Sequence, residues 1–155
     1  MLVIGFDPGS IGFGVGILKK ESNHISYVYS EEIKLKDTDF NTRMKTLWNR
    51  LSAIYSRFPI EDAAMEEGFL GKNIKSMTVL ANVRGVVLAS LIAAGIDMRS
   101  YSPREVKIAL TGTGSALKPQ VEKMVKILLN IKNQTLGTDE SDALAVAYCH
   151  LLHLK

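Results

Sequence analysis

The spacing of hydrophobic residues changes along the chain from every second position to every third or fourth. An apolar segment over residues 2–6 runs into a turn at Pro8-Gly9, and residues 12–18 place glycines on one face and larger apolar side chains on the other. Apolar side chains then recur at most odd positions from 25 to 35. Alternation of this kind predicts three strands, the first two of which form a hairpin. The bare glycine face predicts close approach by a helix or a ligand.

Helical spacing replaces the alternation after residue 40. Apolar residues at intervals of three and four predict long helices from about Phe40 to Pro59 and from about Asn73 to Ala94, with a short strand over Asp62 to Glu67 between them. Beyond them the pattern predicts a strand over Asp97 to Tyr101, a helix that begins at the capping box Ser102-Pro103-Arg104-Glu105, and helices that begin near Pro119 and Thr138. This order predicts an α/β fold with a mixed five-stranded sheet, helices on both faces, and a single domain over residues 1–155.

The second long helix carries more apolar residues than one buried face requires. Ala81, Gly85, Ala89 and Ala93 recur every four residues, and this stripe of small side chains predicts close packing against the sheet or another helix. The helix is therefore the candidate for a subunit interface, although packing on the sheet alone could explain its composition.

Composition narrows the class of protein without identifying it. With 46% hydrophobic residues, a chain of 155 residues can bury a substantial core. The net charge of +3 is only weak evidence for a polyanionic partner. The chain has no run of about 18 apolar residues and no basic-then-apolar start, so we expect neither a membrane span nor export, and a cytoplasmic location.

Asp7 lies where the first strand runs into the Pro8-Gly9 turn. Proline restricts the residue before it and glycine permits a tight reversal, so the carboxylate should be held rigidly at the strand end. One interpretation is that Asp7 opens the turn through a hydrogen bond to the backbone. The other is that Asp7 is a metal ligand, and the remaining acidic residues favour this second interpretation.

Four more acidic residues lie at the ends of predicted elements. Glu66 and Glu67 end the fourth strand on opposite faces, and if that strand is a parallel neighbour of the first, one of them lies beside Asp7. The pattern does not decide between the two. Asp139 and Asp142 share one face at the start of the last helix, where acids also serve as caps. Carboxylates without a supporting cysteine or histidine set favour a hard cation, Mg²⁺ or Mn²⁺.

Five groups of motifs follow one another along nearly the whole chain. They are Phe6-Asp7-Pro8-Gly9-Ser10; Met65-Glu66 followed by Phe69, Lys72 and Asn73; Ala81 with Arg84-Gly85-Val86; Val106-Lys107 with Gly112, Gly114-Ser115-Ala116 and Lys118; and Asp139 with Ser141-Asp142-Ala143-Leu144-Ala145. In this combination the chain resembles the RuvC-type crossover junction endodeoxyribonucleases, which are bacterial Holliday junction resolvases. The resemblance implies an RNase H-like fold and a role in DNA recombination and repair.

The resemblance also implies a set of metal ligands. Asp7, Glu66, Asp139 and Asp142 would hold two Mg²⁺ or Mn²⁺ ions per subunit, which selects Glu66 over Glu67. In some relatives a histidine stands at the position of Asp139. The implied reaction is phosphodiester hydrolysis that leaves a 5′-phosphate and a 3′-hydroxyl.

The same resemblance indicates how DNA would be held and which partners to expect. Lys107 and Lys118 would approach the scissile region as catalytic residues, and the DNA-binding residues would be Phe69, Lys72, Asn73, Lys107, Ser115 and Lys118. Phe69 lies between two glycines, which favours a ring that stacks on an unpaired base over one that folds into the core. The implied partners are four-way junction DNA, a second copy of the chain in a twofold homodimer, and a branch-migration motor complex.

Three alternatives stand beside this interpretation. A YqgF-like protein with an RNase H fold would share the Asp-x-Gly start and act on RNA, but the Phe69 loop and the positions of Lys107 and Lys118 argue against it. Actin-like ATPases and sugar kinases open with a similar strand and turn, yet they need two such domains. A non-catalytic junction-binding protein would have lost acidic ligands, whereas all four are present.

Overall fold

The computed structural model describes residues 1–36, 39–67, 74–132 and 135–154. The predicted DNA-binding residues Phe69, Lys72 and Asn73 lie outside the described residues. The elements follow one another as β1 (Leu2–Pro8), β2 (Gly12–Glu21), β3 (His24–Lys34), α1 (Phe40–Arg57), β4 (Asp62–Glu66), α2 (Ile74–Ala94), β5 (Asp97–Tyr101), α3 (Pro103–Thr111), α4 (Lys118–Leu128) and α5 (Thr138–His153). This order agrees with the prediction, and the capping box at Ser102 is present with Pro103 in the first turn of α3.

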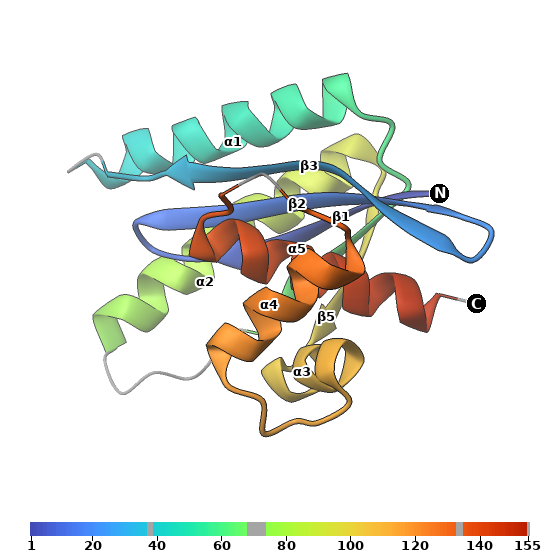
Figure 1. Cartoon of the computed structure of the whole chain (residues 1–155). Coiled ribbons are helices and arrows are strands. Elements are labelled where there is room, and N and C mark those ends of the chain that lie inside the picture. The colour runs from blue at the N-terminus through green and yellow to red at the C-terminus, as the bar shows by residue number, and fades with distance from the viewer. Residues whose placement is uncertain (37–38, 68–73, 133–134, 155) are drawn as a thin grey trace.

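The five strands form one mixed sheet in the order β3-β2-β1-β4-β5 (Figure 1). β1, β2 and β3 are joined as antiparallel neighbours, whereas β4 lies parallel to both β1 and β5. The predicted mixed five-stranded sheet is therefore confirmed. Parallel pairing of β1 with β4 brings the carboxyl ends of these two strands to the same edge, where open sheets bind ligands.

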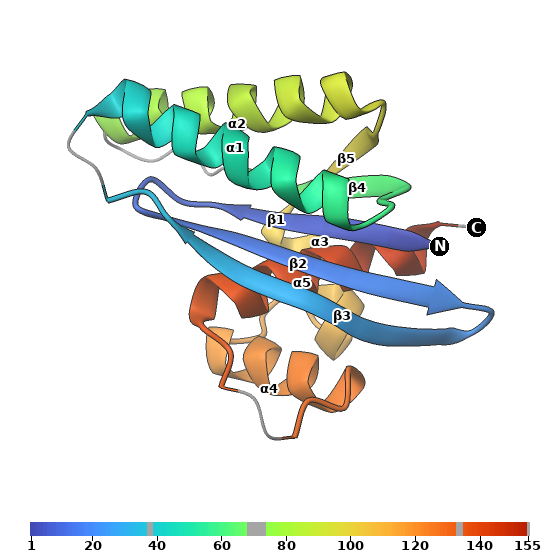
Figure 2. The same ribbon diagram turned by 90° about the horizontal axis from the view of Figure 1, so that it is seen from above.

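Helices cover both faces of the sheet, as Figure 2 shows most clearly: α1 and α2 on one face, and α3, α4 and α5 on the other. Each layer has its own core. Leu47, Leu51, Val83 and Val87 belong to the first, and α5 contributes a continuous buried segment from Ala143 to Ala147 to the second. Burial on both sides of the sheet explains why β1 and β2 read as apolar over most of their length.

The glycine face of β2 lies directly under α5. A Cβ atom added to Gly16 would approach the backbone nitrogen of Leu144 to 2.7 Å, and one added to Gly14 would overlap the carbonyl group of Asp139. Real side chains never keep such distances, so only glycine lets the helix lie this close to the sheet. The predicted close approach by a helix is confirmed, and it brings the first turn of α5 to the edge where β1 ends.

The small-residue stripe of α2 does not pack on the sheet, so that part of the prediction is wrong. Ala81, Gly85, Ala89 and Ala93 are all exposed, and no atom lies within 4 Å of a Cβ built on Gly85. The side chains of α2 that are buried are Val83, Val87, Ser90 and Leu91. The hydrophobic contact with the sheet therefore uses a different face of the helix, and the stripe is open to solvent in the single chain.

α2 is also apolar enough to test the prediction that the chain has no membrane span. By length and composition alone it is the one helix in the described part of the chain that could cross a membrane, with a mean hydropathy of 1.8 over an 18-residue window that is 22% buried. A helix that leaves this much apolar surface uncovered in the single chain is typical of a contact surface.

Candidate active site

Asp7 and Glu66 lie side by side at the edge where β1 and β4 end. The two parallel strands stay in register up to the residue before each acid, so both carboxylates leave the sheet at the same level. Both residues are half-buried. Glu67 is exposed instead, and its backbone N–H donates to the carbonyl of Tyr101 at 2.8 Å. The geometry thus favours Glu66 over Glu67 as the partner of Asp7.

The first turn of α5 brings Asp139 and Asp142 to the same edge. The capping role that either acid could have played belongs to Glu140, whose carboxylate accepts from the backbone N–H of Gly137 at 2.7 Å. The other oxygen of Glu140 accepts from the hydroxyl of Ser30 on β3 at 3.2 Å, which ties the helix start to the sheet. Asp139 and Asp142 are therefore left without a capping function, which favours their role as ligands.

The four carboxylates are close enough to perturb one another. Burial first, and then the charges of the other three acids, raise the pKa of Asp7 to about 7. Burial and the charge of Asp142 raise the pKa of Glu66. Asp139 also has a raised pKa, first through burial and then through the charges of Glu32 and Asp142. Crowded, half-buried carboxylates repel, and a positive charge placed among them relieves that repulsion.

Two lysines supply positive charge at the same edge. The ammonium of Lys118, the first residue of α4, lies 2.6 Å from a carboxylate oxygen of Asp142. Burial by itself would lower the pKa of Lys118. The hydrogen bond to Asp142 and the charge of Asp142 outweigh burial, so the pKa of Lys118 is raised. The charges of Lys118 and Lys107 act on Glu66 as well, and both lower its pKa. A cavity of about 210 Å³ opens here, lined by Glu66, Pro103, Val106, Lys107, Lys118, Val121, Asp142 and Ala145.

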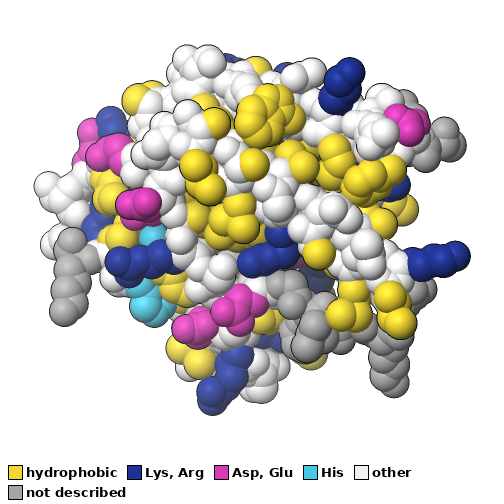
Figure 3. Space-filling view, turned by 180° about the vertical axis from the view of Figure 1, so that it is seen from behind, with side chains coloured by type: hydrophobic (Ala, Val, Ile, Leu, Met, Phe, Trp, Pro, Cys, Tyr) yellow, Lys and Arg dark blue, Asp and Glu magenta, His cyan; other side chains and the backbone are white. Residues whose placement is uncertain are grey.

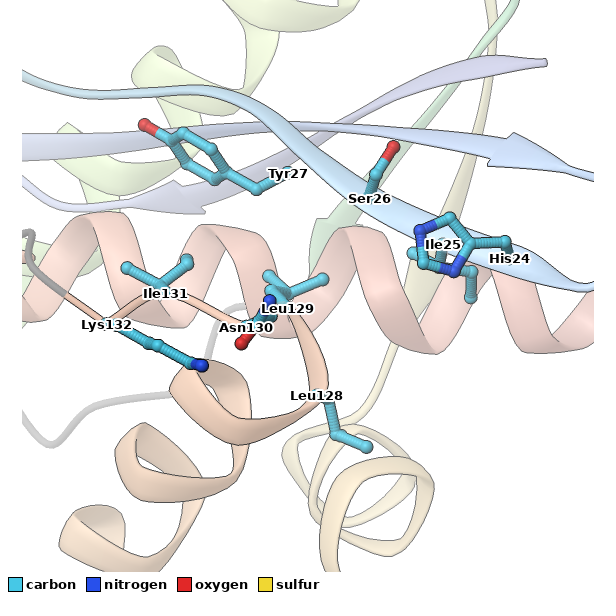
Figure 4. Close-up of a pocket in the computed structure, with 9 residues that line it drawn as sticks. All are labelled: His24, Ile25, Ser26, Tyr27, Leu128, Leu129, Asn130, Ile131 and Lys132. Carbon is cyan, nitrogen blue, oxygen red and sulfur yellow. The ribbon is translucent and has the colours of Figure 1, made fainter.

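Not every predicted residue lies at this cavity. Ser115 is exposed in the loop between α3 and α4, where its hydroxyl and that of Thr113 share a hydrogen bond at 3.0 Å. A larger groove of about 570 Å³ lies between β3 and the end of α4 (Figure 4), with Tyr27 and Lys132 among its walls. None of the four acids lines that groove. The predicted catalytic residues that line a cavity, namely Glu66, Asp142, Lys107 and Lys118, therefore lie at the smaller one.

Comparison with known proteins identifies the family. The sequence model described as "Crossover junction endodeoxyribonuclease RuvC" matches residues 3–150. The chain belongs to the RuvC family. A RuvC protein of Chlorobaculum parvum is 37% identical over 152 residues, covering 97% of this chain and 81% of the relative. That of Thermotoga petrophila is 35% identical, covering 100% of this chain and 94% of the relative.

Solved RuvC structures share the fold of this chain over almost its whole length. The Thermus thermophilus RuvC structure aligns with a TM-score of 0.88 at 29% identity, covering 99% of this chain and 95% of that one. A second structure, described as T. thermophilus RuvC in complex with Holliday junction substrate, aligns with a TM-score of 0.89 at 27% identity and covers 99% and 94% of the two chains. The predicted RuvC-type, RNase H-like fold is confirmed.

The donor atoms at this RuvC site suit a hard cation. Asp7, Glu66, Asp139 and Asp142 offer carboxylate oxygens alone, the preference of Mg²⁺ and Mn²⁺. Across the described ranges, no three Asp, Glu, His or Cys side chains converge tightly enough to bind an ion as they stand. In this arrangement Lys118 pairs with one oxygen of Asp142 that a cation could otherwise use. The chemistry of the four acids therefore suits a divalent cation, and binding one at Asp142 requires the lysine to move.

Two residues near the site had not been singled out from the sequence. Glu32 on β3 pairs with Gly14 across the hairpin, so it lies on the α5 face of the sheet, where its charge acts on Asp139. The alternation of side chains along the strand could have predicted the face on which Glu32 lies, because the neighbouring Ile33 is buried on the opposite face. Glu140 could have been found from its place three residues after Gly137, the spacing of a capping box.

Proposed function

We infer that this chain is a crossover junction endodeoxyribonuclease that resolves four-way DNA junctions, as its membership of the RuvC family indicates. The observation that carries the assignment of residues is the meeting of Asp7, Glu66 and Asp142 at one edge of the sheet. The charges of Glu66 and Asp142 raise the pKa of Asp7, and the charge of Asp142 raises the pKa of Glu66, which supports a shared site. The cavity beside them, with two lysines in its wall, suits an anionic backbone.

We propose that the four carboxylates hold two divalent ions. Bound there, Mg²⁺ or Mn²⁺ would activate the attacking water and stabilise the leaving oxygen during in-line displacement. Asp7, with the most crowded carboxylate, would lie between the two ions. Lys118 would leave Asp142 and neutralise a phosphate oxygen, and Lys107 would do so from the neighbouring helix α3. The products would be ligatable ends, a 5′-phosphate and a 3′-hydroxyl.

DNA contacts beyond the cavity remain predictions from the family resemblance. Phe69 would stack on an unpaired base, and Lys72, Asn73 and Ser115 would hold the backbone near the cut. A branch-migration motor as partner and a cytoplasmic location also remain predictions.

We propose that α2 forms the interface of a twofold homodimer. A four-way junction presents two symmetric strands to cut, and two copies related by a twofold axis would place one site at each. The exposed part of α2 is rich in apolar side chains, with Leu88 40% and Ile92 76% exposed. Figure 3 shows hydrophobic side chains gathered on this side of the molecule.

The double variant Leu88→Glu with Ile92→Glu should be monomeric. Dimerisation would place these charges in an apolar interface, so the dimer Kd should rise by at least about 100-fold. Sedimentation velocity measures the assembly, and a cleavage assay should show single nicks in place of paired ones. The matched control is Ile127→Glu, since Ile127 is 58% exposed on α4, outside this interface. A double variant that stays dimeric would rule out the α2 interface.

Cleavage of synthetic substrates tests the proposed function directly. The purified protein is incubated with a four-way DNA junction, a linear duplex and an RNA–DNA hybrid, each with Mg²⁺ or Mn²⁺. Paired symmetric nicks in the junction alone, religated by DNA ligase, are expected. Preferential cutting of the hybrid would favour the YqgF-like alternative, and junction binding without nicks would favour a non-catalytic protein.

A further inference from the structure

Arg84 reaches from α2 to the ends of β4 and β5, beside the acidic site. Its Nη1 donates to the backbone carbonyl of Glu66 at 2.7 Å, and its Nη2 donates to the hydroxyl of Ser100 at 3.4 Å. Glu66 is the last residue of β4 and Ser100 the penultimate residue of β5. One guanidinium therefore bridges the carboxyl ends of two parallel strands.

The peptide unit between Glu66 and Glu67 is held at both of its polar atoms. Its carbonyl accepts from Arg84, and its N–H, which belongs to Glu67, donates to the carbonyl of Tyr101 at 2.8 Å. Two hydrogen bonds on opposite sides of one planar peptide fix its orientation. That orientation in turn sets the direction in which the Glu66 side chain leaves the strand toward Asp7.

Arg84 contacts the backbone near the site and no carboxylate. In the described part of the chain no Asp or Glu forms an ion pair with its guanidinium. The positive charges that act on the Glu66 carboxylate are those of Lys118 and Lys107. Arg84 is half-buried, and its two hydrogen bonds direct the guanidinium toward the ends of β4 and β5. The planar guanidinium of arginine, with several N–H donors in fixed directions, suits this bridging geometry better than the ammonium of lysine does.

We propose that Arg84 is a positioning residue for junction cleavage, which holds the Glu66–Glu67 peptide so that the Glu66 carboxylate faces Asp7. The inference rests on the proposed function for its effect on cleavage, whereas the anchoring of the peptide stands independently of it. Because α2 also carries the proposed interface, the same helix that meets the second subunit sets the direction of a catalytic carboxylate.

Three variants test the role of Arg84. Arg84→Met keeps the length of the side chain and removes its donors, and Arg84→Lys keeps one charged donor. Arg50→Met is the matched control, because Arg50 on α1 pairs with Glu31 at 2.6 Å, in the same helical layer. The measurements are the single-turnover cleavage rate at saturating protein, the junction Kd in Ca²⁺, and amide hydrogen exchange at Glu67.

Arg84→Met should lower the cleavage rate by about 10–100-fold, the usual effect of losing a group that orients a metal ligand. The junction Kd should stay within about twofold, since the arginine contacts no DNA in this role. The Glu67 amide should exchange about 10-fold faster because its peptide is anchored at one end only. Arg84→Lys should recover part of the rate, and Arg50→Met should match the wild type in all three measurements.

Two results would overturn the proposal. One is Arg84→Met with wild-type cleavage and wild-type exchange at Glu67. The other is a loss of cleavage matched by an equal rise in junction Kd with unchanged exchange, which would make Arg84 a phosphate ligand. Failure of the wild type to cut any junction would refute the proposed function instead, and faster exchange at Glu67 would still establish the anchor.

Discussion

Asp7→Asn is expected to abolish Mg²⁺-dependent cleavage of a four-way junction, with a loss of about 1000-fold or more. The carboxylate is the most crowded of the four, and an amide cannot supply the charge that would hold the two proposed cations, so several kcal/mol of transition-state stabilisation should be lost. Junction binding should persist, because the proposed DNA contacts are made by residues other than Asp7. Single-turnover cleavage and binding in Ca²⁺ measure the two effects separately.

The same variant should be more stable than the wild type when no metal is present. The unfolded Asp7 carboxyl ionises near its ordinary pKa of 3.8, whereas burial and the neighbouring acids raise its pKa in the folded protein to about 7. The folded state is therefore penalised increasingly as pH rises from about 4 through 7, and asparagine removes this penalty. In EDTA at pH 8, Asp7→Asn should raise the Tm by roughly 2–8 °C, with the difference vanishing toward pH 4.

Asp97→Asn is the matched control for both measurements. Asp97 is exposed at the amino end of β5, on the opposite edge of the sheet from the acids. The control should cut junctions at the wild-type rate with an unchanged Tm. Wild-type cleavage by Asp7→Asn would refute the assignment of the site.

Glu66→Gln and Glu67→Gln should have very different effects on cleavage, which distinguishes the roles of these two adjacent acids. Glu66 lines the cavity with Asp142, so Glu66→Gln should lower the cleavage rate by about 1000-fold. Glu67 is exposed and contributes its backbone N–H, which glutamine retains, so Glu67→Gln should stay within about threefold of the wild type. The reverse order of effects would make Glu67 the ligand. Single-turnover rates under identical Mg²⁺ measure both variants.

Much of the fold followed from patterns that are local in the sequence. The glycine face of β2 predicted close approach by a helix, which α5 makes, and the capping box at Ser102 placed the start of α3. The acids Asp7 and Glu66 were found because each ends an apolar strand before a turn or loop. Alternation, helical spacing and turn chemistry depend on neighbouring residues, so they can be read without knowing what packs against them.

The predictions for α2 and α5 show what local sequence patterns cannot decide. The small-residue stripe has the spacing of a packing face, yet the exposed stripe and the buried Val83 face differ only in which side of the helix meets the sheet. Likewise, Asp139 and Glu140 are both acids in a first turn; the capping-box spacing after Gly137 points to Glu140 as the cap, and the structure shows its contact with the Gly137 N–H and with Ser30 on β3.

By itself the sequence determined the order of strands and helices, the set of four carboxylates and the likeness to RuvC-type nucleases. Only the tertiary structure decided that β4 lies beside β1 and that Lys118 holds Asp142. The tertiary structure also showed that Arg84 anchors the peptide after Glu66. The physical reason is that these contacts join elements far apart in the chain. The register and orientation of these elements are set by packing on both faces of the sheet at once.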